Sequence, residues 1–193
     1  MDTLRAFVCS LLPMSAADFA LLPPLARPQA VPKGAYLLEP GQVCEWVFFA
    51  RSGLLRLYYV DAAGHEVNCR FTAAPGFLTD FQSFLSQQPS RYYWQALEAS
   101  EVLAFQHADV QRLYRESAGW ERFGRLMAEH VYQQVNERIE LLQFLTPTQR
   151  YEHVRATHPA LLARVSQFQL ASYLGIKPES LSRIRRRLGQ RRA

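Results

Sequence analysis

Hydrophobic and polar positions follow two different periods along the chain, and the change comes near Phe105. Before it, short β-prone runs alternate with turns that contain glycine and proline, a pattern typical of an antiparallel sandwich, roll or barrel. The runs predicted as strands are Ala35–Glu39, Trp46–Ala50, Leu54–Val60, Glu66–Phe71, Tyr92–Leu97 and Val102–Phe105. The first 30 residues predict short helical pieces, with Ser15 as an N-cap and Pro23, Pro24 and Pro28 closing the segment.

After Phe105 the pattern predicts helices: a short one over His107–Ser117 and a long one over Trp120–Leu145. The long helix carries an apolar stripe made of Phe123, Met127, Val131, Val135, Ile139 and Leu142. Since a helix of about 40 Å needs a partner surface along most of its length, we interpret the stripe as a dimer interface. The alternative is packing against the chain's own β domain, and the two can hold at different ends.

Two short helices with a tight turn between them are predicted near the C-terminus. Thr146 and Pro147 begin a preceding helix, and Ser166 caps a helix whose buried face carries Leu170, Ala171 and Leu174. Gly175 supplies the left-handed residue that ends this helix, and Pro178 suits the first turn of the next. Small Ala171 together with Gly175 and Ile176 forms a helix-turn-helix signature.

The second of these helices has one apolar and one basic face. Leu181, Ile184 and Leu188 are its buried positions. The other side and the turn before it carry the predicted DNA-contacting residues Lys177, Glu179, Ser180, Ser182, Arg183, Arg186 and Arg187. In a major groove, an arginine pairs with guanine and a glutamate accepts from cytosine, so Arg183 and Glu179 are the candidate base readers. We expect Arg185–Arg187 and Arg191–Arg192 to meet phosphates.

The distribution of charge along the chain supports DNA binding by the C-terminal part. Residues up to Thr146 include 12 basic and 15 acidic side chains, whereas those from Pro147 onward include 10 basic and 2 acidic ones. A mildly acidic body with a basic end fits an anionic polymer bound by one domain. Three scattered cysteines without a CxxC pair predict neither disulfides nor a zinc knuckle. The sequence shows neither a signal peptide nor a membrane span, so we expect a cytoplasmic protein.

The segment Leu170–Gly175 followed by Glu179–Arg183 resembles the DNA-binding motif of the Crp–Fnr superfamily of bacterial regulators. Gly41, Ser52-Gly53 and the Asp61–Gly64 turn are similar too, so the resemblance covers almost the whole chain. It implies an α+β protein with an N-terminal antiparallel, jelly-roll-like β-roll sensor domain (1–117), a dimerisation helix and hinge (118–146) and a helix-turn-helix domain (147–193).

The resemblance also assigns roles to individual residues. It gives base contacts to Glu179 and Arg183. Pro178 occupies the position where many members place a base-reading arginine, so the operator preference should differ. The sequence ends five residues after Leu188, and we therefore expect no β-hairpin wing after the second helix.

The cyclic-nucleotide cassette of that family has a Gly-Glu pair and, about ten residues later, an arginine followed by Ser or Thr. The corresponding residues here are Thr79, Asp80, Arg91 and Tyr92, and Asn136 on the long helix lies where a purine would be contacted. Threonine in place of glycine and tyrosine in place of a small hydroxyl residue crowd the phosphate site. We therefore expect another small-molecule effector or none, and Arg91 also suits a surface arginine beside a strand.

Two other classes of function stay open on the residues alone. A β-roll also suits a cupin-like metal enzyme, although the strand region holds only His65 and no His-x-His pair. A protein-interaction module with a basic tail is the second alternative. We expect no catalysis, no metal and no cofactor. The partners that we expect are double-stranded DNA and a second copy of the chain, with RNA polymerase as a further candidate.

Overall fold

The computed structural model describes residues 1–190, so the predicted phosphate contacts of Arg191–Arg192 lie outside the described residues. The chain forms two compact units. The first contains residues 1–58 and 71–130, and the second contains residues 59–70 together with the chain from Val131 onward. Each unit has a hydrophobic core of its own.

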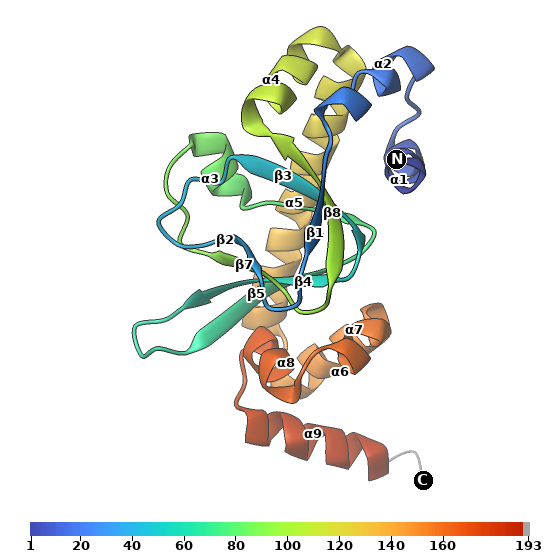
Figure 1. The fold of residues 1–193 in the computed structure, drawn as a ribbon. Coiled ribbons are helices and arrows are strands. Elements are labelled where there is room, and N and C mark those ends of the chain that lie inside the picture. The colour runs from blue at the N-terminus through green and yellow to red at the C-terminus, as the bar shows by residue number, and fades with distance from the viewer. Residues whose placement is uncertain (191–193) are drawn as a thin grey trace. The chain divides into compact units, whose positions relative to one another are not determined.

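Two antiparallel four-stranded sheets form the β domain (Figure 1). One sheet has the order β1-β8-β3-β6 and the other the order β2-β7-β4-β5. The strands are β1 (Arg27–Val31), β2 (Tyr36–Leu38), β3 (Trp46–Ser52), β4 (Leu54–Val60), β5 (Glu66–Ala73), β6 (Gly76–Leu78), β7 (Tyr93–Ala96) and β8 (Ser100–Gln106). The predicted α+β class with an N-terminal antiparallel two-sheet domain is confirmed.

Two strands, β1 and β6, were not predicted. We expected Pro28 to close a helical segment, but it lies inside β1 and pairs with Leu103 of β8. Proline is tolerated there because β1 is the edge of its sheet, where one side of the strand needs no hydrogen-bond donor. The strand β6 is too short for its alternation to stand out, and it adds to β3 through residues 76–78.

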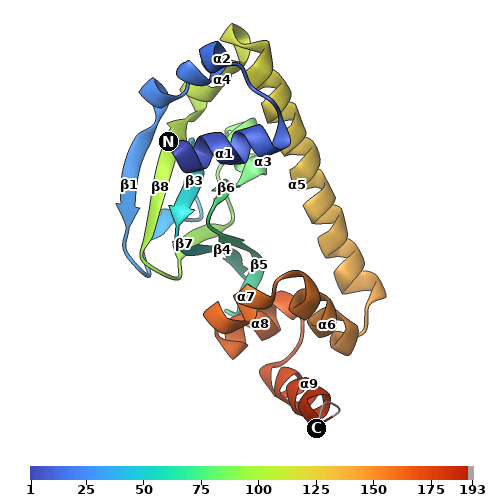
Figure 2. The ribbon, with the colours of Figure 1, turned by 90° about the vertical axis from the view of Figure 1, so that its right-hand side faces the viewer.

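Short helices frame this domain: α1 (Asp2–Leu11), α2 (Ala16–Ala20), the 3₁₀ turn η1 (Pro23–Leu25), α3 (Phe81–Ser86) and α4 (His107–Glu116). Helix α1 packs beside β3 (Figure 2). There the ring of Phe7 contacts the rings of Phe49 and Phe77. Ser15 caps α2 as predicted. The hydroxyl of Ser117 donates to Asp18 Oδ1 at 2.6 Å and thereby ties α2 to the beginning of the long helix.

The remaining helices are α5 (Ala118–Phe144), α6 (Pro147–Thr157), α7 (Pro159–Arg164), α8 (Gln167–Leu174) and α9 (Pro178–Gln190). Their beginnings and ends confirm the predicted signals. Thr146 and Ser166 each accept from the backbone N–H three residues later, and the glutamine at that position reaches back to complete a capping box. In the second unit, Leu170, Leu174 and Leu181 share one core with Leu141 and Val154.

Within the second unit, a serine of α8 contacts the backbone of strand β5. Ser172 Oγ accepts from the backbone N–H of Asn68 at 2.9 Å and donates to the carbonyl of Glu66 at 2.7 Å. Because β5 is a sheet edge, these two backbone groups have no neighbouring strand on that side. One hydroxyl thus satisfies an acceptor and a donor that a further strand would otherwise pair with.

An arginine reinforces the same contact. The guanidinium of Arg138, on α5, lies 4.2 Å from the ring centroid of Tyr173 and its Nη2 donates to the carbonyl of Asn68. Burial lowers the pKa of the Arg138 guanidinium and raises the pKa of the neighbouring Cys69 thiol, an effect that the charge of Arg138 partly offsets. The thiol of Cys69 therefore stays protonated at a pH where an exposed thiol begins to ionise.

This arrangement predicts the order in which two cysteines react with iodoacetamide. Because only the thiolate is nucleophilic and the Cys69 pKa is raised, Cys69 should react several-fold more slowly than exposed Cys9 near pH 8. Replacing Ser172 with Ala should cost about 1–3 kcal/mol of unfolding free energy and speed the alkylation of Cys69. Peptide mapping by mass spectrometry measures each rate.

The buried Cys44 of the first unit is the internal control for this experiment. Its alkylation rate should not change in the Ser172→Ala protein, whereas global loosening would raise both rates together. Equal rates at Cys9 and Cys69 in the unmodified protein would contradict the burial of the β5 edge.

Candidate nucleic-acid interface

The turn between α8 and α9 has the geometry that two closely crossing helices require. Gly175 adopts φ +64°, and a Cβ at this position would lie 3.1 Å from Leu142 Cδ2 and 3.3 Å from Arg150 Nη1. The backbone N–H of Ile176 donates to the carbonyl of Ala171 at 3.0 Å, which closes the last turn of α8 as a Schellman motif. Ala171 is fully buried, so its small side chain lets the elements of this core approach one another.

Helix α9 is strongly two-faced. Leu181, Ile184 and Leu188 are buried at spacings of three and four residues, which confirms the predicted apolar face. The predicted DNA-contacting residues other than Ser180, which is half-buried, are exposed: Lys177, Glu179, Ser182, Arg183, Arg186 and Arg187. Within the described part of the chain, none of the arginines of α9 has a carboxylate within ion-pair distance, so their charge faces solvent.

Two of these arginines have intrachain partners that set their direction. Arg183 Nη2 donates to Ser180 Oγ at 3.3 Å, one turn nearer the N-terminus of α9. Arg187 Nη2 donates to Thr148 Oγ1 at 2.6 Å and is therefore linked to α6. Each bond uses one of five guanidinium donors, which leaves donors for an anion. Arg183 lies over the first turns of α9, and Arg187 lies at the junction with α6.

Arg150, which joins helices α6 and α8 to the end of α5, was not predicted to have a structural role. Arg150 Nε donates to the carbonyl of Leu145 at 2.9 Å, Nη2 to that of Leu142 at 2.6 Å and Nη1 to that of Leu174 at 3.0 Å. These carbonyls belong to the last turns of α5 and α8, where helices leave backbone acceptors unsatisfied. The sequence shows an arginine after a helix start but no sign that two helix ends meet beside it.

The proposed dimer stripe on α5 has three environments. Phe123 is buried in the first unit against Phe77, with ring centroids 5.7 Å apart, and Met127 packs on the same core. Leu142, at the other end, packs on the core of the second unit. Between them Val131 is half-buried, whereas Val135 and Ile139 are 46% and 45% exposed. Packing on the chain's own cores thus accounts for the ends of the stripe and leaves its middle exposed.

The residues aligned with the cyclic-nucleotide cassette are engaged in local structure. Thr79 Oγ1 donates to the carbonyl of Trp46 at 3.0 Å. Asp80 is buried and serves as the N-cap of α3, with its carboxylate accepting from the backbone N–H of Ser83. Arg91 is exposed and Tyr92 is half-buried. Asn136 is half-buried on α5 in the second unit.

Neither a membrane-spanning helix nor a metal cluster is found among residues 1–190. No helix in this range is both long and apolar enough to cross a membrane. In the same range, no three side chains of His, Cys, Asp or Glu are grouped so that they could hold a metal ion.

Comparison with known proteins gives a consistent result. Residues 28–117 match the cyclic nucleotide-binding domain family. No curated protein matches the chain. Among solved structures, FixK2 from Bradyrhizobium japonicum is similar with a TM-score of 0.77 and 17% identity, covering 86% of this chain and 85% of that one.

Two further solved structures are similar over most of both chains. CLP from Xanthomonas campestris, a c-di-GMP-responsive global regulator, has a TM-score of 0.72 and 16% identity, covering 91% of this chain and 92% of its own. A protein from Eubacterium rectale described as a crp/fnr-family transcriptional regulator has a TM-score of 0.73 and 15% identity, covering 92% and 85%. Residues 28–117 therefore match the cyclic nucleotide-binding domain family, and the chain has the fold of the Crp/Fnr transcription regulators, which confirms the resemblance seen in the sequence.

Proposed function

We propose that this chain is a sequence-specific, dimeric DNA-binding transcription regulator that acts in the cytoplasm. The observation that carries the proposal is α9, which buries three apolar residues and exposes Glu179, Arg183 and Arg186 after a helix-turn-helix turn. A helix of this kind suits the major groove, where its first turns reach base edges. Arg183 and Glu179 would read bases, whereas Lys177, Ser180, Ser182, Arg186 and Arg187 would contact neighbouring bases or the backbone.

The organisation that we propose has three parts, which are a β-roll sensor domain (1–117), a dimerising helix and hinge (118–146) and a DNA-binding domain (147–193). The exposed middle of the stripe on α5 supports a second copy of the chain as the partner along this helix. RNA polymerase is a further candidate partner of a regulator bound upstream of a promoter. The proposal involves no catalysis, and selective DNA binding distinguishes it from a protein-binding module with a basic tail.

The ligand of the β-roll domain is proposed not to be a cyclic nucleotide. Thr79 and Asp80 are held by Trp46 and by the cap of α3. A cyclic phosphate needs backbone N–H groups that it can approach closely and an arginine that neutralises its charge. Since the side chain of Thr79 replaces a glycine and Tyr92 replaces a small hydroxyl residue, this approach is obstructed.

Selective DNA binding tests the function itself. A dimer with paired recognition helices should prefer a roughly palindromic site with half-sites about one helical turn apart. Arg183→Ala should cost about 1–3 kcal/mol of binding free energy and relax the preference at one symmetric base position, because a bidentate contact with a base is lost. Arg187→Ala should weaken all sequences alike and flatten the salt slope by about two units per dimer.

The measurement is a titration of a selected site and a scrambled site at several salt concentrations. Arg115→Ala, which removes an exposed arginine from α4 in the first unit, is the control for a general loss of charge. Thermal melting checks that loss of the bond from Arg187 to Thr148 has not unfolded the domain. Equal affinity of the unmodified protein for both sites, unaltered by Arg183→Ala, would leave only a basic surface and would favour the interaction-module alternative.

Dimerisation is tested on the exposed middle of the stripe. Val131→Glu combined with Val135→Glu would place four carboxylates in the seam of a dimer, so the variant should sediment as a monomer at micromolar concentration. Gln133→Glu is the matched control, because Gln133 is exposed and lies about 160–200° around the helix from both valines. Analytical ultracentrifugation that finds the double variant still dimeric would show that another surface forms the dimer.

Cyclic nucleotides provide the test of the effector site. Neither cyclic AMP nor cyclic GMP should bind with a dissociation constant below about 10 μM, equivalent to roughly −7 kcal/mol. Isothermal titration calorimetry of the full chain measures this constant directly. Tighter binding of either nucleotide would mean that the loop of Thr79 and the side chain of Tyr92 rearrange to admit the phosphate.

A further inference from the structure

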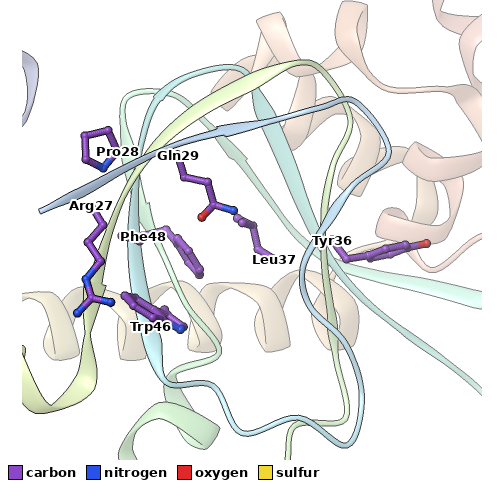
Figure 3. Close-up of a pocket in the computed structure, with 8 residues that line it drawn as sticks. Arg27, Pro28, Gln29, Tyr36, Leu37, Trp46 and Phe48 are labelled. Carbon is purple, nitrogen blue, oxygen red and sulfur yellow. The ribbon is translucent and has the colours of Figure 1, made fainter.

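An open cleft of about 420 Å³ lies in the first unit, and none of the residues that line it is aligned with the cyclic-nucleotide cassette. Strands β1, β3 and β8 of one sheet and β2 of the other contribute its walls (Figure 3). The volume lies within the range of small-molecule sites, about 300–1,000 Å³. The residues that line the cleft include Arg27, Gln29, Leu37, Trp46, Phe48 and Ala104.

The cleft is lined by apolar and aromatic side chains together with the polar side chains of Arg27 and Gln29. Phe48 lines the cleft but is only 4% exposed, so most of its ring is already packed. Trp46 is half-buried two residues earlier on the same strand, and the two side chains therefore lie on the same face of β3. Figure 3 shows Phe48, Leu37 and the amide of Gln29 approaching one another in the middle of the cleft, whereas Tyr36 points away. Such walls favour a planar ring with one polar substituent.

Among the residues that line the cleft, Arg27 carries a positive charge. The Arg27 guanidinium lies 4.8 Å from the ring centroid of Trp46, and its Nη2 donates to Gln106 Oε1 at 3.0 Å. Asp109 Oδ2 is 3.9 Å from the same nitrogen, beyond hydrogen-bonding distance, while Arg112 donates to the other oxygen of Asp109 at 2.9 Å. Since Gln106 takes one of five N–H donors, the guanidinium keeps the parallel pair of donors that a carboxylate accepts.

We propose that this cleft binds a small aromatic monocarboxylate. Its ring would pack against Trp46 and Phe48, its carboxylate would pair with Arg27, and the Gln29 amide would face a substituent of the ring. The positive charge of Arg27 is already partly offset by Asp109, 3.9 Å away, so it can balance at most one further negative charge. This favours a carboxylate over a dianionic phosphate. This binding is independent of the proposed reading of DNA, and either can fail alone.

Titration of the full chain with benzoate, phenylacetate and indole-3-acetate tests the proposal, with the neutral amide of each acid as the uncharged counterpart. Saturation-transfer NMR detects binding, and calorimetry gives the dissociation constant. At least one acid should bind at least tenfold more tightly than its amide. Arg27→Gln should abolish that difference, Trp46→Leu should weaken acid and amide together, and Asp109→Asn should tighten the acid about threefold by removing a competing carboxylate.

Arg51→Gln is the matched control, because Arg51 is also an exposed arginine of this sheet and lies 3.8 Å from a carboxylate, that of Glu101. It should leave every dissociation constant unchanged. No binding of any acid at about 10 mM, equal binding of acids and amides, or an Arg51→Gln effect as large as that of Arg27→Gln would each overturn the proposal. Operator binding by the same preparations separates this failure from failure of the proposed regulator function.

Discussion

The second unit depends on the three hydrogen bonds of Arg150. A helix end leaves carbonyls that no residue of the helix can satisfy, and here the ends of α5 and α8 come to one guanidinium. Lysine would be a poor replacement, because its one nitrogen would have to reach carbonyls that three different nitrogens of Arg150 meet here. Gly175 complements this arrangement, since a Cβ there would lie 3.3 Å from Arg150 Nη1. The turn that a helix-turn-helix requires is thus also the space into which the arginine fits.

The same unit shows how the edge of a β-sheet can be closed without another strand. Ser172 on α8 supplies one donor and one acceptor to the β5 backbone at Asn68 and Glu66. Neighbouring Tyr173 packs under the Arg138 guanidinium, so two consecutive residues of α8 join it to the hairpin and to α5. Exposed edges are sites of unwanted pairing, and a helix that is needed for another purpose covers this one. The first helix of the proposed DNA-binding motif is thus held by Ser172 and Tyr173 as well as by the core that it shares with α9.

Local signals in the sequence predicted much of this structure. Capping residues Ser15, Thr146 and Ser166 and the left-handed Gly175 lie where they were expected, because each acts on backbone within a few residues of itself. The buried faces of α8 and α9 followed from helical periodicity for the same reason. Strand β1 was missed because Pro28 signals a break, and only the sheet order reveals that its missing N–H lies on an unpaired edge. Arg150, Ser172 and the Arg27 cleft depend on groups far apart in the sequence, which no local pattern encodes.

Helix α5 explains why a stripe of regular spacing did not have one regular environment. Its spacing keeps apolar residues on one side, yet an apolar residue is buried by whichever surface lies beside it. Phe123 is buried against the β domain, and Leu141 and Leu142 pack on the helical core. Between them, Val135 and Ile139 remain almost half exposed, and Tyr132 is 68% exposed. A long helix gains most of its stability from packing along an apolar face, and an uncovered middle weakens that support. This is the physical reason for expecting a second copy of the chain at the middle of α5, where neither core of a single chain covers the helix.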